Sequence, residues 1–242
     1  MQATFLTINP RELNFSFYSL VAREPKLWLL YQPYKFWIQL KRIRRGAKPQ
    51  EAFVSRDTEI VIDGYQGSAN SFASNVFLQH QSQEIKIAHH MHSPAQIIRA
   101  VKYDLPVILV IREPEKAILS LASRWSYISV NSGLRSYINF YKKLRPFSNK
   151  LVISTFEQTT QDFDSIVEQL NIKHQTNFDL PCMNLANQKM KPPEANSKRK
   201  DWKKLKQLEF SSSENQNLLH QAVEVYQHFA EIAQKTRTAN FQ

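Results

Sequence analysis

Three histidines, His89, His90 and His92, are the side chains of this sequence best suited to accept a proton near neutral pH. An apolar segment predicts a strand over 85–89; His89 is its last residue, and His90 and His92 follow it. Clustered histidines can also bind a metal ion, but neighbouring side chains of a strand point to opposite faces, and no cysteine or carboxylate accompanies these three. We therefore expect a general base, His92 ahead of His90, and no metal site. We expect His89 to be a buried histidine with satisfied hydrogen bonds.

A second segment has the features of an anion-binding turn. Glu59–Asp63 (EIVID) predicts a short buried strand, a turn containing Gly64 and Gly67 follows, and a helix is expected over 71–82. Backbone N–H groups at the N-terminus of such a helix bind anions well. Three side chains of the turn could add hydrogen-bond donors: Ser68, Asn70 and Ser71. The segment therefore predicts a phosphate site.

The spacing of this turn is that of the ATP-binding pattern G-x-x-x-x-G-K-[ST], with Gly64 first and Ser71 last. Ala69 replaces the second glycine, and Asn70 replaces the lysine that would contact the β- and γ-phosphates. We therefore do not expect ATP or GTP hydrolysis. An alternative interpretation remains open, in which Ser68 caps the helix and no ligand binds.

An arginine and a serine follow the strongest strand signal of the chain, the fully apolar Val107–Ile111 (VILVI). The Arg112 guanidinium at the end of this strand offers a two-pronged hydrogen-bond donor to phosphate. Pro114 starts a helix, and Ser120 lies about two turns along it on a similar face. The two side chains could thus hold one phosphate. The alternative is a surface ion pair for Arg112 and an ordinary helix serine.

Strands and helices alternate through most of the chain, which predicts an α/β fold with a parallel β-sheet flanked by helices on both faces. In such sheets ligands bind at the carboxyl ends of the strands, where the turn, the histidines and the arginine all fall. The predicted strands are 59–63, 85–89, 107–111 and 151–155. The helices expected beyond 71–82 cover about 94–101, 114–124, 134–144, 163–170 and 218–232.

The chain divides into an extension and one domain. Residues 1–50 form an N-terminal aromatic and basic extension, and 51–242 form a single domain with a basic loop or lid at about 185–210. We expect the extension to pack on the domain, because aromatic stripes usually find a core. The alternative is peripheral contact of 27–45 with an anionic membrane surface, since aromatic residues there precede clustered lysines and arginines.

Composition narrows the class of protein further. The 242 residues are 42% apolar, which suits one large domain, and the formal charge of +11 favours anionic partners such as nucleotides, nucleic acids, sulfated glycans or membranes. Cys182 is the only cysteine, so no internal disulfide can form and a reducing, cytoplasmic location is expected. No secretory signal and no membrane-spanning stretch is recognisable in the sequence.

Taken in order, these segments resemble the motifs of the sulfotransferase family, whose members use 3′-phosphoadenosine-5′-phosphosulfate (PAPS) and have a P-loop NTPase-like fold. Tyr65–Phe72 (YQGSANSF) resembles the family's phosphosulfate loop Y-P-[KR]-S-G-T-T-W. Arg112–Ser120 (REPEKAILS) resembles its R-x-P-x-x-x-x-x-S stretch, and His92–Pro94 resembles its H-x-P segment. Thr155–Glu157 (TFE) and Lys200–Lys203 (KDWK) are similar to its [YF]-E-[DE] and G-D-W-K segments.

The resemblance covers roughly 59–170, with a weaker match near residue 200, and it implies a role for each matching residue. The residues implied to bind the nucleotide are Gly67, Ser68, Ala69, Asn70, Ser71, Phe72, Arg112, Ser120, Phe156, Lys198 and Arg199. Within this set the loop would hold the 5′-phosphosulfate, Arg112 and Ser120 the 3′-phosphate, and the two phenylalanines would lie near the adenine. His92 would be the general base of sulfonyl transfer, which needs no metal.

One departure from the family pattern bears on catalysis. Gly67 stands where the family's loop has a lysine or arginine that neutralises charge on the leaving phosphate during transfer. A lysine from elsewhere could supply that charge, and the candidates are Lys116, Lys189 and Lys191. Otherwise the protein is slow, altered or inactive as an enzyme.

Three functions follow from these observations. The first is a sulfotransferase acting on a hydroxyl or amine acceptor, such as a small molecule, a glycan or a lipid-linked sugar. The second is a sulfotransferase-like protein that binds the nucleotide but is catalytically impaired at Gly67. The third, which leaves the ordered motifs unexplained, is a nucleic-acid-binding domain that uses the charge of +11 and the aromatic and basic residues of 28–45.

Overall fold

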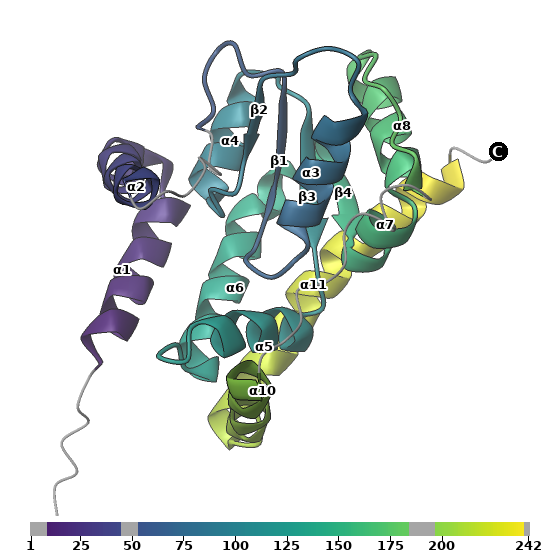
Figure 1. The fold of residues 1–242 in the computed structure, drawn as a ribbon. Coiled ribbons are helices and arrows are strands. Elements are labelled where there is room, and N and C mark those ends of the chain that lie inside the picture. The colour runs from purple at the N-terminus through teal and green to yellow at the C-terminus, as the bar shows by residue number, and fades with distance from the viewer. Residues whose placement is uncertain (1–8, 45–52, 184–196, 240–242) are drawn as a thin grey trace, which may run out of the picture.

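The centre of the structure is a sheet of four strands that all run parallel (Figure 1). The computed structural model describes residues 9–44, 53–183 and 197–239, and within them the strand order is β2-β1-β3-β4. The strands are β1 (Ile60–Gly64), β2 (Ile87–His89), β3 (Val107–Ile111) and β4 (Val152–Thr155). The predicted α/β fold with a parallel sheet is therefore confirmed, although the strand expected over 85–89 begins only at residue 87.

Helices cover both faces of this sheet (Figure 1). On one face lie α3 (Asn70–His80) and α8 (Phe163–His174), and on the other lie α4 (Pro94–Lys102), α6 (Val130–Leu144) and α11 (Ser213–Ala239). The other elements around them are α5 (Pro114–Arg124), α7 (Phe156–Gln161) and the 3₁₀ helix η2 (Arg145–Lys150). The two layers of helices explain why β3 is apolar throughout and β1 is apolar up to Asp63, since every residue of both strands is buried.

The strand side chains alternate between two hydrophobic cores, as the pleat of a strand requires. The core beneath α3 and α8 receives Ile60, Ile62, Ile108, Val110 and Val152. The core beneath α4, α6 and α11 receives Val61, Val107, Leu109, Ile111 and Ile153. Both cores meet at β1 and β3, so these two strands fix the position of every segment that follows them.

Three helices of the domain begin at a side chain that caps them. Ser93 caps α4, Ser129 caps α6, and Thr155 caps α7 by accepting a backbone N–H of the first turn. The N-cap residue of α3 is Ala69, which has a left-handed backbone and no side chain that could accept such a bond. The first N–H groups of α3 therefore have neither an intrahelical partner nor a side-chain cap.

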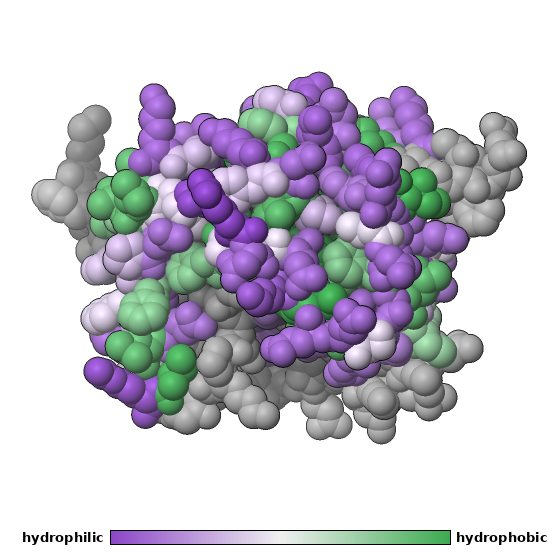
Figure 2. All heavy atoms as spheres, turned by 90° about the horizontal axis from the view of Figure 1, so that it is seen from above, coloured by the Kyte–Doolittle hydropathy of each residue, from purple (hydrophilic) through white to green (hydrophobic). Residues whose placement is uncertain are grey.

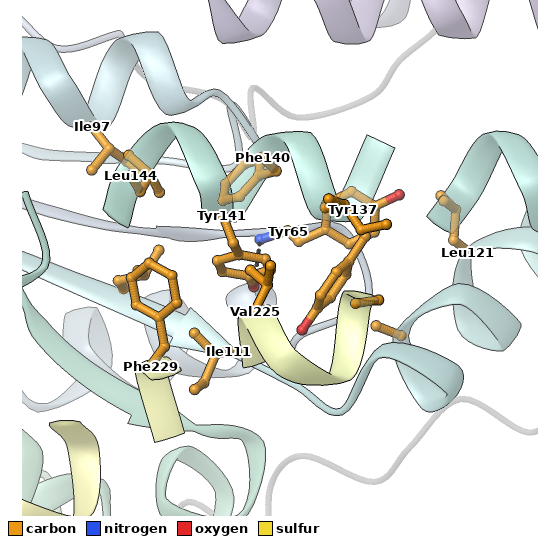
Figure 3. Close-up of a cluster of buried hydrophobic side chains, with 14 of the residues drawn as sticks. Tyr65, Ile97, Ile111, Leu121, Tyr137, Phe140, Tyr141, Leu144, Val225 and Phe229 are labelled. Atoms are coloured by element: carbon orange, nitrogen blue, oxygen red, sulfur yellow. Dashed lines mark hydrogen bonds between the residues drawn. The ribbon is translucent and has the colours of Figure 1, made fainter. Parts of the chain in front are cut away.

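Three tyrosines pack together beneath the turn that joins β1 to α3 (Figure 3). The hydroxyl of Tyr141 donates to Val110 O at 3.2 Å and accepts the N–H of Tyr65 at 3.4 Å. The hydroxyl of Tyr137 donates to Arg112 O at 2.6 Å. Burial raises the pKa of all three phenols, so they remain neutral hydrogen-bonding groups. The cluster ties the backbone after β1 and after β3 to one helix, α6.

The N-terminal extension forms two helices, α1 (Pro10–Arg23) and α2 (Trp28–Ile43), joined by the 3₁₀ helix η1 (Pro25–Leu27). α1 packs against α4 and α6 at one side of the sheet (Figure 1). The buried Tyr31 hydroxyl donates to Met91 O at 2.6 Å, and Ser93 Oγ donates to Ala22 O at 2.6 Å. These bonds join the extension to the segment that carries the three histidines.

The loop expected at about 185–210 differs from the structure in its second half, which is the helix α10 (Ser197–Glu209). Residues 184–196 lie outside the described part of the chain. The segment was difficult to recognise as a helix because it is polar on nearly every side. Its lysines, leucines and glutamines nevertheless have high helix propensity, and the buried Lys206 and Phe210 attach its end to the domain. In the described residues, no helix combines the length and the apolar character that crossing a bilayer requires.

Gly64 ends β1 so close to β3 that a Cβ added there would stand 2.0 Å from Val110 O. Gly64→Ala is therefore expected to lower the free energy of unfolding by about 1–3 kcal/mol, because the sheet must open to admit the methyl group. Gly133→Ala is the matched control, since its Cβ would meet only the flexible Ile118 side chain at 3.1 Å. Urea unfolding measures both variants. Equal free energies for the two would contradict a close approach of the strands at Gly64.

Candidate functional site

A groove with a volume of about 1540 Å³ opens at the carboxyl ends of the strands, between the turn after β1, α2, α5 and α10. It is larger than the roughly 300–1,000 Å³ typical of a site for one small ligand. The predicted site residues that line it are Gly67, Ala69, Asn70, Ser71, Phe72, His90, His92, Arg112, Ser120, Phe156 and Arg199. The structure thus brings together segments that are up to 130 residues apart in the sequence. Ser68 is fully buried, and the side chain of Lys198 lies outside the described part.

The charged residues that line the groove all have the same sign. Its walls carry eight lysines and arginines and, among the described residues, no aspartate or glutamate. The cations are Arg11, Lys35, Arg112, Lys116, Arg124, Arg199, Lys200 and Lys203. Burial, and next the charge of Arg199, lowers the pKa of Arg124, because the guanidinium group of α10 repels the cation on the adjacent α5. A polyanionic ligand would relieve this repulsion.

The turn between β1 and α3 presents backbone donors to the groove. Gly67 and Ala69 have positive φ angles of 87° and 73°, so the chain curls and aims the uncapped start of α3 at the groove. The alternative of a helix capped by Ser68 is not what the structure shows. Ser68 is buried and its N–H donates to Tyr65 O at 3.3 Å. The anion-binding groups of this turn are therefore backbone N–H groups.

The three side chains that begin α3 have different tasks in the turn and the groove. Asn70 Nδ2 donates to Gly64 O at 3.1 Å and to Tyr65 O at 2.9 Å, so this side chain holds the turn in shape. Ser71 is exposed, and its Oγ lies 2.7 Å from His90 Nε2. Phe72 is half-buried and packs on the core beneath α3, with one edge in the groove. Of these three, Ser71 is the side chain best placed to reach a ligand.

Arg112 and Ser120 meet at the same point of the turn. Arg112 Nη1 donates to Gly67 O at 2.8 Å, and a Cβ built on Gly67 would stand 3.2–3.3 Å from the Ser120 side chain. The guanidinium is stacked on the Phe156 ring, 4.0 Å from its centre. The alternative of a surface ion pair for Arg112 is not favoured, because the neighbouring carboxylate of Glu113 pairs with Lys116 at 2.7 Å.

The guanidinium of Arg112 is only partly satisfied. Its Nε is buried and has no hydrogen-bond partner among the described residues. Burial lowers the pKa of Arg112, although the group remains a cation at any physiological pH. A buried donor of a charged group without a partner is costly, and an anion in the groove is the partner that would offset this cost.

His92 is held by a carboxylate that the sequence did not lead us to expect. The backbone N–H of His92 donates to both oxygens of Asp63, at 3.2 and 2.9 Å, and its Nδ1 lies 3.4 Å from Asp63 Oδ1. The same Nδ1 lies 2.9 Å from Gly64 O. Because a carbonyl oxygen can only accept, Nδ1 carries the proton and Nε2 carries the lone pair. The ring is thus oriented to accept a proton at Nε2.

His90 is less suited to proton transfer. Burial, and next the neighbouring His89 and His92, lowers its pKa to about 3, so it is a weak base. His89 is half-buried, not fully buried as expected, and the Nδ1 atoms of His89 and His90 form a hydrogen bond. Within the described residues, no group of three or more histidine, cysteine or acidic side chains is placed to hold a metal ion.

The depressed pKa of His90 makes stability depend on pH. The unfolded chain binds a proton at this histidine near pH 6.5, whereas the folded chain binds it only near pH 3. The stability that depends on a neutral His90 is therefore fully present above pH 6.5 and is lost progressively as the pH falls toward 3. His90→Gln is expected to lose less unfolding free energy than the wild type between pH 7 and about pH 4.5. Urea unfolding at both pH values measures this, and identical losses would contradict a buried neutral His90.

The sequence reasoning missed Lys35, which lines the groove, and Asp63, which is buried behind His92 and does not line the groove. Asp63 was visible as the one charged residue at the end of an apolar strand, and burying a carboxylate is costly unless it is hydrogen-bonded. Lys35 lies in α2, is 6% exposed, and has its Nζ 5.4 Å from the centre of the Tyr18 ring. No sequence pattern marks Lys35, because only the packing of the extension brings it to the groove.

The predicted lid residue Arg199 borders the groove on α10. Its Nε donates to Ser123 Oγ at 3.5 Å, and α10 packs on α5. A smaller cavity of about 290 Å³ adjoins the groove between α1 and α6, and His92 lines both. Part of its lining is polar and uncharged, and the rest is apolar apart from His92, Arg23 and Arg135; the polar part consists of Ser16, Ser19, Gln66, Ser132, Ser136 and Asn139. His92 therefore borders both the large cationic groove and the small cavity.

No protein-family model matches the chain, and no match was found among curated proteins or among solved structures. Function therefore has to be inferred from the residues of the groove.

Proposed function

We propose that this chain is a sulfotransferase with a P-loop NTPase-like fold, which moves a sulfonyl group from PAPS to a hydroxyl or amine acceptor. The observation that carries the proposal is the cationic groove in which the backbone turn, the pair Arg112 and Ser120, and His92 converge. The nucleotide fits this lining because it is polyanionic, while the groove has an uncapped helix start and an unpartnered buried guanidinium donor.

Each group of the groove has a task in this proposal. The N–H groups at the start of α3 and the hydroxyl of Ser71 hold the 5′-phosphosulfate, and Arg112 with Ser120 holds the 3′-phosphate. The donor supplies the sulfonyl group and leaves as 3′-phosphoadenosine-5′-phosphate (PAP). His92 Nε2 takes the proton of the attacking hydroxyl as the new S–O bond forms and the bond from sulfur to the leaving phosphate oxygen breaks, and Asp63 orients the ring. The acceptor is placed by the small cavity that His92 also lines, where four serines and Asn139 can bind its hydroxyl groups and apolar side chains can contact its carbon atoms.

The basic residue that Gly67 lacks is supplied by Lys35 in this proposal. Among the earlier candidates, Lys116 is paired with Glu113, and Lys189 and Lys191 lie outside the described residues. Lys35 lines the groove, and its positive charge is close enough to contribute to lowering the pKa of His90. It is therefore positioned to offset the negative charge that develops on the leaving phosphate.

Lys35→Met is expected to slow sulfonyl transfer by at least about tenfold, with a smaller effect on PAP binding, because the charge acts mainly in the transition state. The exposed Lys26 on η1, nine residues earlier in the chain, provides the control variant Lys26→Met. Single-turnover rates and calorimetric affinities separate the two effects. If Lys35→Met transferred the sulfonyl group at the wild-type rate and had unchanged thermal unfolding, another residue would have to supply the positive charge at the leaving phosphate.

A second candidate function is nucleotide binding without transfer, and the conformation of Gly67 favours it. Its φ of 87° and the 3.0 Å between an added Cβ and Ala117 O make a lysine at this position strained. Gly67→Lys or Gly67→Arg would therefore distort the turn instead of simply restoring a missing charge. If the chain has lost catalysis here, the loss cannot be reversed by this substitution alone.

The test combines binding and turnover. Calorimetry with PAP is expected to show binding that an excess of PAPS competes away, and incubation with sulfur-labelled PAPS and a panel of sugars, phenols and amines is expected to label an acceptor. Binding without labelling would support the second function. No binding by folded protein would overturn both, and salt-sensitive binding of single-stranded nucleic acid that PAP does not displace would favour the nucleic-acid alternative.

A further inference from the structure

The outward face of α2 carries apolar side chains where a surface helix normally carries polar ones. Leu29 is 78% exposed, Leu30 63%, Phe36 61% and Trp37 53%. Positions seven and eight apart return to the same side of a helix, so these four side chains lie on one arc. Single exposed leucines are ordinary, but four large apolar side chains on one arc of a helix mark a contact surface.

The packing of α2 on the domain does not need these residues. The opposite arc of the helix holds Trp28, Tyr31 and Lys35, all of which are buried. Trp28 and Tyr31 contact Met91 and Ala95 in a separate small core. The helix is thus anchored by one arc, while the other is presented outward. Green apolar side chains gather at the left edge of Figure 2, the side on which α2 lies in Figure 1.

The charges around this arc indicate what it contacts. The segment 25–44 contains no aspartate or glutamate. Lys26 precedes the arc, and Lys41 and Arg44 follow it; all three are exposed. Lys41 Nζ lies 3.3 Å from the centre of the Trp37 ring, so a cation and an aromatic ring are presented together. Aromatic and aliphatic side chains bordered by cations are the pattern of helices that lie in the headgroup layer of anionic membranes.

We propose that α2 docks flat on an anionic lipid bilayer, with Leu29, Leu30, Phe36 and Trp37 inserted at headgroup depth and the three cations against lipid phosphates. A second copy of this chain fits less well, because a two-fold symmetric contact would bring identical cations together. Since Tyr34, Lys35 and Ile38 of the same helix line the groove, the groove would open beside the membrane surface.

The experiment is co-sedimentation of the full chain with vesicles of phosphatidylcholine, alone or mixed with phosphatidylglycerol. Binding is expected to the mixed vesicles only and to weaken as salt is raised. The double substitution Leu29→Gln and Leu30→Gln is expected to reduce binding at least about tenfold, and Lys41→Glu is expected to weaken it as well. Leu208→Gln, on the exposed face of α10 where the side chain is 71% exposed, is the control and should bind as the wild type does.

Three outcomes would overturn the proposal. They are a wild-type chain that ignores both kinds of vesicle, a double variant that binds as well as the wild type, and a wild-type dimer in sedimentation velocity that the double variant abolishes. The last would assign the arc to a second copy. Unchanged thermal unfolding of the variants keeps these outcomes separate from misfolding, and none of the measurements depends on sulfotransferase activity.

Discussion

Replacing Arg112 with alanine is expected to weaken PAP binding by about 100-fold or more. Each hydrogen bond to a charged group contributes about 1.5–3 kcal/mol, and the guanidinium fork can form two with one phosphate. The fork is already oriented, because it is stacked on Phe156 and bonded to Gly67 O. Isothermal titration calorimetry of the wild type and the variant measures the loss.

The controls for Arg112 separate charge from geometry. Arg112→Lys retains the cation but not the fork, so an affinity between those of the wild type and the alanine variant is expected. Arg145→Ala removes an exposed arginine from η2, outside the groove, and should leave the affinity unchanged. If Arg112→Ala and Arg145→Ala bound PAP equally well, the groove would be attracting anions only through its total charge.

Replacing His92 with glutamine is expected to lower the rate of sulfonyl transfer by about 10²–10⁴-fold while PAP binding stays close to that of the wild type. Glutamine retains a hydrogen-bonding side chain but cannot accept the acceptor's proton. Rates measured with saturating donor, together with the calorimetric affinity, distinguish the loss of a base from the loss of a binding residue.

His220→Gln is the matched control for this variant, because His220 is exposed on α11, lies outside the groove and pairs with Glu224 in the same helix. It should have no effect on the rate. Full activity of His92→Gln would mean that proton transfer uses another group or that the reaction needs no base. A parallel fall in PAP affinity would instead make His92 a binding residue.

The sheet and the placement of the site could be predicted because both depend on local patterns. The apolar run Val107–Ile111 predicts a buried strand by itself, and parallel strands bring their carboxyl ends to one edge. The segments that begin at Gly67, His92 and Arg112 therefore had to meet once the strand order was β2-β1-β3-β4. The sequence could therefore predict which segments border the groove, because their meeting follows from this topology.

The remaining features depend on tertiary packing that leaves no local pattern. Lys35 borders the groove only because α1 and α2 fold back onto the domain, and it resembles any lysine of an amphipathic helix in the sequence. Asp63 and His92 are far apart in the chain, so their pairing follows from the register of β1 and β2. The helix α10 was taken for a loop because its polar residues show propensity without a buried stripe.

The tyrosines beneath the groove determine how this protein can move. Tyr65 N–H and Arg112 O are both bonded to hydroxyl groups of α6, and a third bond joins α6 to Val110 O in the centre of the sheet. The turn after β1 therefore cannot open without breaking bonds in the core, so its backbone amides should exchange with solvent through the same rare openings as those of β3. A ligand would meet a surface that is already ordered, and little of its affinity would be lost to arranging it.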